Sequence, residues 1–340
     1  MPHPSGSPLS LSDLAESLVH HDEISAAARL LAGRIRRTPV LPLEGSELLL
    51  KAEHLQLLGS FKIRGALNAV ATLPEDVRAR GVVAFSSGNH GKAVAYAAGL
   101  YGIKATVVMP HTAPAVKVDG VRALGATVEL VTPERRDVYP YELAERTGAH
   151  LVHPFDSRAA IAGHGTLALE LLEQVPDVSA VLVPVSGGGL LSGVAAAVKA
   201  LRPQVAVIGV EPELAGDAAE SLRRGERAVW TTADAYRTCA DGLRATTLGT
   251  LPWAHIRRLV DDIVTVSEDD ITEALSCLAR QGRQLVEPSG AVAPAALLRG
   301  RHVPPATAGP VVAVVSGGNA DPALVASLLT APSRKSIQTM

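Results

Sequence analysis

The chain has 340 residues, of which 47% are hydrophobic, 19% charged and 3% aromatic, with a formal net charge of −2. This length is sufficient for two domains with a large buried core, whereas the near-neutral charge and the few aromatic rings argue against a protein that binds nucleic acid or a membrane surface. The two cysteines, Cys239 and Cys277, are too few for a disulfide scaffold or a cysteine-rich zinc site, and they fit a reducing cytoplasm.

The N-terminus and one apolar segment bear on the location of the protein. Residues 1–17 have neither a basic start nor a continuous apolar run, so we expect no secretory signal. Residues 178–198 carry no charge and are long enough to span a bilayer. Pro184 and the glycines at 187–189 interrupt this segment and would expose backbone groups to lipid. We therefore interpret the segment as a strand, a glycine loop and a helix of a soluble protein.

Strand-forming and helix-forming segments alternate along the chain. Short runs rich in Val and Ile predict strands at residues 47–53, 81–86, 105–109, 127–131, 180–185, 206–210 and 311–315. Segments rich in Ala and Leu predict helices at residues 62–73, 89–101, 115–124, 158–174, 190–201, 268–281 and 321–330. This alternation predicts an α/β fold with parallel sheets covered on both faces. No long linker separates two halves, so we expect one domain to be inserted within another.

Open parallel sheets bind ligands beyond the carboxyl ends of their strands, so the turns after the predicted strands are candidate binding sites. In the first unusual turn, Lys62 stands at a predicted helix start between Phe61 and Ile63. A lysine in apolar surroundings can have a lowered pKa and act as a nucleophile. Taken alone, however, Lys62 is better explained as an ordinary surface residue of an amphipathic helix.

Small residues at helix starts mark the second and third turns. The turn 86–91 offers backbone N–H groups to an anion such as a carboxylate, unless it is only a helix cap. The turn 186–190 contains three consecutive glycines, which let the backbone wrap around a phosphate, but it lacks the lysine of a P-loop. A dinucleotide-binding loop is the closer competitor because Glu211 ends the next strand, although Ser192 stands where that motif has its third glycine.

The fourth turn, 314–319, contains Ser316, which can offer a hydroxyl to a ligand or cap a helix. A lysine, a phosphate-binding loop and a serine hydroxyl together suit the aldehyde, the phosphate and the pyridine nitrogen of pyridoxal phosphate. The motifs SFKIRGA, SSGNHG, SGGGLLSG and VVSGGN occur in this order. With them the chain resembles the serine racemase and serine/threonine dehydratase family of fold type II pyridoxal-phosphate enzymes, from about residue 34 to 330.

The resemblance implies a role for each turn. Lys62, beside Phe61, resembles the lysine that binds the cofactor aldehyde and moves the substrate α-proton on one face. Ser87 resembles the serine that moves a proton on the opposite face in racemases, where many L-specific dehydratases have alanine; otherwise it is only a carboxylate ligand. The substrate carboxylate would be held by Ser86, Ser87, Gly88, Asn89 and His90. The other cofactor contacts would come from Asn89 at the ring hydroxyl, from Ser186, Gly187, Gly188, Gly189 and Leu190 at the phosphate, and from Glu287, Ser316 and Gly317 at the ring.

Further positions match the family. Glu211, Ala215 and Asp217 reproduce the spacing of its divalent-cation site, which implies Mg²⁺ or Ca²⁺ bound by oxygen ligands. Arg136 falls where relatives orient the substrate with an arginine, although the adjacent Arg135 could also be aligned with that position. A guanidinium at Arg244 could pair with a second substrate carboxylate, as in 3-hydroxyaspartate.

The resemblance implies two open parallel-sheet domains with the cofactor between them: a large domain of residues 1–78 and 153–340 and a small mobile domain of residues 79–152. It also implies a cytoplasmic homodimer that converts a hydroxy amino acid of the L-serine or L-threonine type to an α-keto acid and ammonia, with serine racemase activity through Lys62 and Ser87. The alternatives are a 3-hydroxyaspartate dehydratase or racemase, a β-replacement synthase of the same fold, a nicotinamide-dependent oxidoreductase, and a catalytically silent binding protein.

Overall fold

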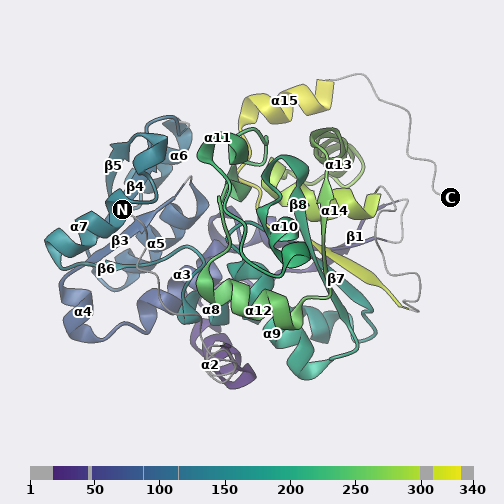
Figure 1. Ribbon diagram of the computed structural model, residues 1–340, viewed down its shortest axis with the longest axis horizontal. Coiled ribbons are helices and arrows are strands. Elements are labelled where there is room, and N and C mark those ends of the chain that lie inside the picture. Colours follow the sequence, from purple (N-terminus) through teal and green to yellow (C-terminus); the bar gives the residue numbers. More distant parts are fainter. Residues whose placement is uncertain (1–17, 45–47, 87, 114, 299–308, 331–340) are drawn as a thin grey trace.

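Two sheets form the framework of the molecule (Figure 1). The computed structural model describes residues 18–44, 48–86, 88–113, 115–298 and 309–330. The larger sheet has the strand order β1–β2–β10–β7–β8–β9, and the smaller one has the order β5–β4–β3–β6. The strands are β1 (Val40–Pro42), β2 (Leu49–Lys51), β3 (Val82–Phe85), β4 (Ala105–Pro110), β5 (Thr127–Val131), β6 (His150–Leu151), β7 (Ala180–Pro184), β8 (Ala206–Pro212), β9 (Asp262–Val266) and β10 (Val311–Val314).

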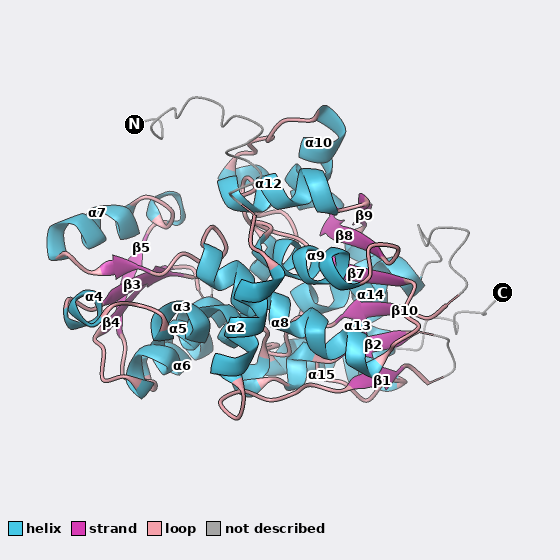
Figure 2. Cartoon of the chain, turned by 90° about the horizontal axis from the view of Figure 1, so that it is seen from below, coloured by secondary structure: helices cyan, strands magenta, loops and turns pink. Residues whose placement is uncertain are grey.

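Helices lie on both faces of the two sheets, which stand apart from each other in Figure 2. The α-helices are α2 (His21–Leu31), α3 (Lys62–Ala71), α4 (Glu75–Ala79), α5 (Asn89–Leu100), α6 (Ala115–Arg122), α7 (Tyr139–Thr147), α8 (Arg158–Gln174), α9 (Gly189–Leu201), α10 (Asp217–Arg224), α11 (Thr232–Ala235), α12 (Thr250–Leu259), α13 (Glu268–Arg280), α14 (Pro288–Leu298) and α15 (Pro322–Thr330). Short 3₁₀ turns are η1 (Glu53–Leu55), η2 (Leu57–Gly59), η3 (Pro133–Arg135), η4 (Glu213–Ala215) and η5 (Asp241–Leu243). The α/β prediction is confirmed.

Alternating strand residues build a core on each face of both sheets. In β7, Val181 and Val183 pack with α8 and α9, whereas Leu182 packs with α13 and α14. In β3, Ala84 packs with α5 and α6, whereas Val83 packs with α7. Because successive side chains of a strand point to opposite faces, strands covered on both sides become continuous apolar runs. This is why these strands are so clearly visible in the sequence.

One strand departs from the expected parallel arrangement. The pairs of β2 with β10, β10 with β7, β7 with β8 and β8 with β9 are parallel, but β1 pairs with β2 in antiparallel register, with Val40 opposite Lys51. The connection from β1 to β2 is short, and a parallel pair would need a crossover of a dozen or more residues. An antiparallel edge strand is therefore the arrangement that this connection permits.

The smaller sheet is built from one continuous part of the chain, β3 to β6, whereas strands before and after it build the larger sheet. The exact boundaries at 78/79 and 152/153 stay a prediction.

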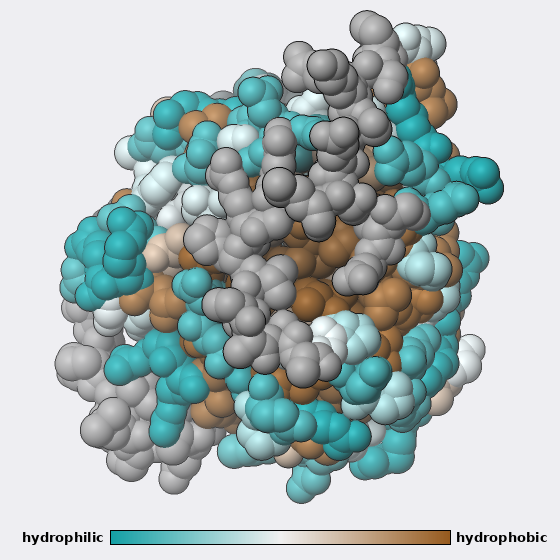
Figure 3. Space-filling view, turned by 90° about the vertical axis from the view of Figure 1, so that its right-hand side faces the viewer, coloured by the Kyte–Doolittle hydropathy of each residue, from teal (hydrophilic) through white to brown (hydrophobic). Residues whose placement is uncertain are grey.

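None of the helices in the part of the chain described is long and apolar enough to cross a membrane. On the face that lies to the right in Figure 1, hydrophobic residues gather near the centre with hydrophilic residues around them (Figure 3).

Candidate active site

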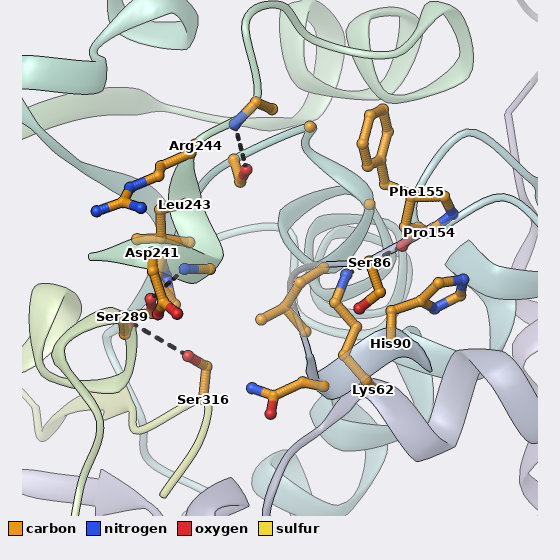
Figure 4. A pocket seen from close by; sticks show the side chains of 18 of the residues that line it. Lys62, Ser86, His90, Pro154, Phe155, Asp241, Leu243, Arg244, Ser289 and Ser316 are labelled. Atoms are coloured by element: carbon orange, nitrogen blue, oxygen red, sulfur yellow. Dashed lines mark hydrogen bonds between the residues drawn. The ribbon is translucent and has the colours of Figure 1, made fainter. Parts of the chain in front are cut away.

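A cavity of about 120 Å³ lies where the turns after several strands meet, and both sheets contribute to it. Figure 4 shows side chains from these turns pointing toward one another across this space. The sequence predicted many of the lining residues, namely Phe61, Lys62, Ser86, Asn89, His90, Arg136, Ser186, Gly187, Gly188, Gly189, Leu190, Arg244, Glu287 and Ser316. The structure therefore brings all four predicted turns to one cavity.

Lys62 is the first residue of α3, and its side chain reaches the cavity near Ser86 and His90 (Figure 4). Its Nζ donates a hydrogen bond to the carbonyl of Pro154 at 3.0 Å and lies 4.9 Å from the centroid of the Phe61 ring. Burial lowers the pKa of the Lys62 ammonium to about 8, because little water remains to solvate its charge. The amine is thus available as a nucleophile and a base near neutral pH.

A buried ion-pair network holds the helix that carries Lys62. Two residues further along α3, Arg64 makes paired hydrogen bonds to Glu53, both at 2.8 Å, and to Glu170 at 2.8 and 2.9 Å. The ammonium of Lys51 donates to Glu170 at 2.8 Å. Arg64, Lys51 and Glu53 have fully buried side chains, and together with Glu170 the network has two cations and two carboxylates. The network therefore fixes α3 against β2, η1 and α8.

The glycine turn after β7 has no room for side chains. A Cβ atom on Gly187 would lie 2.4 Å from the ring of Phe155, and one on Gly188 would lie 2.8 Å from Pro252. Gly188 also has a φ of +91°, in the left-handed region that favours glycine. The turn leads into α9, whose first N–H groups have no partner within the helix. These residues fit a phosphate group at a helix N-terminus.

Asn89, at the start of α5, connects two polar residues from the far end of the chain. Its Nδ2 donates to Oε1 of Glu287 at 2.6 Å, and its Oδ1 accepts from Nδ2 of Asn319 at 2.8 Å. Burial raises the pKa of Glu287 to about 7, and within the described residues its Oε2 has no hydrogen-bond partner. Gly317 lies beside this carboxylate, where a Cβ would be only 2.0 Å from Oε1. The carboxyl group of Glu287 is thus held at the cavity, and its Oε2 is left without a hydrogen bond among the described residues.

The hydroxyl of Ser316 also lies at the cavity, in the turn after β10. It donates to the carbonyl of Ser289 at 3.3 Å, while Oγ of Ser289 accepts from the N–H of Gly242 at 2.8 Å. A serine hydroxyl can rotate, so Ser316 can turn its proton from this long bond toward an acceptor atom of a ligand. This contact chain also ties η5 to the start of α14.

The turn after β3 faces the cavity from the smaller sheet. Oγ of Ser86 accepts from the N–H of Gly88 at 2.8 Å, and His90 lines the cavity one turn further on. Burial, and next the positive charge of Lys62, lower the pKa of His90 to about 3, so its imidazole is neutral. Gly88 lies beside the cavity rather than in its lining. Ser87 lies outside the described residues.

The structure resolves which of two neighbouring arginines reaches the cavity. Arg136 lines it, donates to both carboxylate oxygens of Asp137 at 2.7 Å, and donates to Oη of Tyr236 at 3.0 Å. Arg135 instead pairs with Glu142 at the surface. Arg244 lines the cavity too, but it donates to the carbonyl of Thr238 at 2.6 and 3.1 Å.

The predicted metal ligands form a separate buried cluster at the end of β8. Glu211 accepts from the N–H groups of Ala218 and Ala219 at 3.2 and 2.8 Å. Burial, and then the nearby Asp217, raise the pKa of Glu211 well above its usual range, and burial raises the pKa of Asp217 to about 8. Oδ2 of Asp217 has no partner in the ranges described. Two buried acids and the adjacent backbone of Ala215 fit a hard divalent cation.

Several cavity residues were missed because they have no local sequence signal. Lys117, Pro154, Phe155, Asp241 and Ser289 come from parts of the chain far apart in sequence, and only the fold brings them together. Asn319 belongs to the VVSGGN motif, but it received no role. Its position directly after the glycines of that motif is the signal that could have assigned it to Asn89.

The chain is similar to known pyridoxal-phosphate enzymes over most of its length. Residues 31–317 match the family described as "Pyridoxal-phosphate dependent enzyme". The chain is 42% identical to a serine racemase of Oryza sativa subsp. indica, over 88% of this chain and 91% of the relative. It is also 42% identical to the L-threonine ammonia-lyase of Thermotoga maritima, over 88% and 75%. The crystal structure of a T.th. threonine deaminase superposes with a TM-score of 0.82 at 45% identity, covering 89% of this chain and 99% of that one.

Proposed function

This chain belongs to the pyridoxal-phosphate dependent enzyme family, and from that premise we propose that it converts L-serine or L-threonine to an α-keto acid and ammonia. The observation that carries the proposal is the single cavity where a lysine of lowered pKa meets a glycine turn suited to phosphate. The similarity to a serine racemase and an L-threonine ammonia-lyase supports the substrate class.

The residues of the cavity fit the cofactor. Lys62 would bind its aldehyde, the turn from Ser186 to Leu190 its phosphate, and Asn89 its ring hydroxyl. Ser316 would face the pyridine nitrogen, where a neutral hydroxyl, unlike a carboxylate, does not hold a proton on the ring. Glu287, with its free buried Oε2, would lie beside the ring. When bound, pyridoxal phosphate withdraws electrons from the α-carbon of an amino acid and so weakens its C–H bond.

The chain's own groups would perform the proton transfers. Once free, Nζ of Lys62 takes the α-proton of the L-amino acid, since its lowered pKa suits a general base near neutral pH. The β-hydroxyl leaves as water and takes up one proton, which balances the proton that Lys62 removes from the α-carbon. The released enamine then takes up water and loses ammonia, so the net products are the keto acid and ammonia. The turn from Ser86 to His90 would orient the substrate carboxylate, with Arg136 at the rim.

Racemisation would need a second acid on the other face of the α-carbon. We assign this role to Ser87, which precedes Gly88 and Asn89 in the turn that contributes to the cavity wall. Lys62 and Ser87 on opposite faces would allow a proton to be removed from one side and returned on the other. Elimination and racemisation would then share the first proton transfer.

A divalent cation, Mg²⁺ or Ca²⁺, would bind at Glu211, Asp217 and the carbonyl of Ala215. The support is the pair of buried acids with raised pKa values and the unpartnered Oδ2 of Asp217. A cation there would offset the like charges of the two carboxylates. The site is outside the cavity lining, so the ion would act on stability and not on the reacting atoms.

The assembly and the mobile parts complete the proposal. Residues 79–152 would form a small domain that moves over the cavity, against a large domain of residues 1–78 and 153–340. The protein would be a homodimer of the cytoplasm, as its family resemblance and its two cysteines suggest.

The test uses purified protein loaded with pyridoxal phosphate and Mg²⁺. L-Serine, L-threonine and L-3-hydroxyaspartate are incubated separately, and keto acid and both enantiomers of each amino acid are quantified. We expect keto acid from serine or threonine, together with D-serine, and loss of all turnover in Lys62→Ala. In Ser87→Ala, D-serine should disappear while keto acid remains.

Other results would redirect the assignment. Keto acid without D-serine in the wild type would make the protein a dehydratase alone, with Ser87 as a carboxylate ligand. Turnover of 3-hydroxyaspartate alone would move the substrate to the acidic class, for which Arg244 at the cavity is the relevant side chain. If none of the three substrates reacts, a β-replacement with an added nucleophile becomes the function to test.

A further inference from the structure

An ion pair in the lining of the cavity joins two parts of the chain that are far apart in sequence. The ammonium of Lys117, on α6, contacts Oδ2 of Asp241, on η5. Both side chains line the cavity, and they are only 13% and 25% exposed. Exclusion from water makes such a contact stronger than the exposed pairs common at protein surfaces.

The two partners are anchored in different cores. Val118 and Val121 of α6 pack in the core of the smaller sheet. Leu243 of η5 packs in the core of the larger sheet, and the N–H of Gly242 is bound by Ser289 of α14. The ion pair therefore joins two separately packed units.

The stem of Lys117 also touches the turn proposed to hold the substrate carboxylate. A Cβ atom on Gly88 would lie 2.8 Å from Cδ of Lys117, so the lysine covers the backbone of this turn directly. A second contact reaches the same segment of the chain, the hydrogen bond from Arg136 to Oη of Tyr236 at 3.0 Å. Both the ion pair and this hydrogen bond end in the segment between α11 and α12.

We propose that the Lys117–Asp241 ion pair is a latch: it holds α6 and the turn at Gly88 against η5, and so keeps the cavity closed around the substrate. Lys117 is in this view a positioning residue, which acts through Asp241 and the turn and does not contact the reacting atoms. If the closed state is the one that binds substrate, loss of the latch reduces the population of that state. The apparent affinity for substrate then falls in proportion to this population. The proposal rests on the proposed function only for its kinetic readout.

The experiment compares Lys117→Ala, Asp241→Ala and the exchanged pair Lys117→Asp/Asp241→Lys in the loaded enzyme. Each single variant should lower kcat/KM for L-serine by about tenfold, mainly through KM. The exchanged pair should recover most of the loss, because a latch needs opposite charges and not a given order. Arg122→Ala is the matched control, since its pair with Asp119 lies on the same helix but is exposed. It should leave the kinetics unchanged.

Amide hydrogen exchange gives a readout that does not depend on turnover. In the single variants, peptides covering residues 115–124 and 236–249 should exchange faster than in the wild type, and in the exchanged pair they should regain protection. If exchange is unchanged in the single variants, the latch does not exist. If the exchanged pair stays as slow as Lys117→Ala in catalysis, Lys117 binds the substrate itself. Without turnover of any hydroxy amino acid the proposed function fails, while the exchange data still decide on the latch.

Discussion

Two buried clusters of charged side chains in this molecule differ in their balance of charge. Around Arg64, two cations and two carboxylates pair with distances of 2.8 to 2.9 Å. At the end of β8, Glu211 and Asp217 are two carboxylates without an ion pair in the described part of the chain. The first cluster is complete and serves to fix α3, whereas the second would be completed by the divalent cation proposed above. If the metal proposal holds, charge balance distinguishes the structural cluster from the binding site.

The largest expected effect on stability comes from a substitution in the ion-pair cluster around Arg64. Arg64→Met would leave Glu53 and Glu170 buried with less positive charge, which should destabilise the protein by about 3–5 kcal/mol. Thermal unfolding of the loaded enzyme should show a fall in Tm of about 10 °C. Arg224→Ala, which removes an exposed pair with Glu220, should change Tm by no more than about 1 °C. Equal effects of the two changes would remove the distinction between buried and exposed pairs.

Glu287 is an intermediate case, a single buried acid with Asn89 as its polar partner. Its pKa in the folded state, about 7, lies above the ordinary value of 4.5. The folded protein therefore holds this proton more tightly, and the stability it contributes is lost as the pH rises from about 4.5 to 7. The shift corresponds to about 3 kcal/mol.

Glu287→Gln should remove this dependence in cofactor-free protein. Urea unfolding at about pH 5 and about pH 8 measures it as the difference between the two proteins: the wild type should lose more stability than the variant over this interval. A parallel loss in both proteins would mean that Glu287 has an ordinary pKa.

Metal binding has the smallest expected effect on the free energy of unfolding. It should raise this free energy, whereas Arg64→Met should lower it. Mg²⁺ or Ca²⁺ at about a hundred times its Kd should stabilise the wild type by about 2.7 kcal/mol. Asp217→Asn removes one of two like charges, so without metal at about pH 8.5 it should raise Tm, in contrast to Arg64→Met. The same variant should abolish the response to metal. A lower Tm of Asp217→Asn without metal would show that the cluster is structural after all.

The sequence predicted most of the fold because the buried strands carry their own signal. Segments such as 180–185 and 206–210 are uncharged runs rich in Val, and β7 and β8 lie there. The strand β1, with three residues and a proline, and β6, with two residues, are too short for any periodicity. The helix α14 is apolar on all sides and contains Pro294, so it has no amphipathic pattern to detect. Its apolar surface is explained only by its burial between α13 and the larger sheet.

The residues of the candidate site also fall into two groups, those with a local sequence signal and those without one. Lys62, the glycines and Ser316 lie in turns of unusual composition, so the local sequence marked them as candidates, and the four motifs together gave them roles. Lys117 and Asp241 are an ordinary lysine on a helix and an ordinary aspartate in a loop, and only their meeting across the cavity gives them a role. Residues that act by pairing over long distances in the chain have no signal in a single sequence.

The strand order of the larger sheet has a consequence for how the protein is made. β10, near the end of the described chain, lies between β2 and β7, so Leu49 meets Val312 only when nearly the whole chain has emerged from the ribosome. At ordinary rates of translation β2 therefore waits roughly half a minute for its partner. The smaller sheet uses strands from 82 to 151 alone and can close long before. We expect nascent chains that stop before residue 311 to contain a folded small sheet beside two unpaired strand edges, which makes them targets for chaperones.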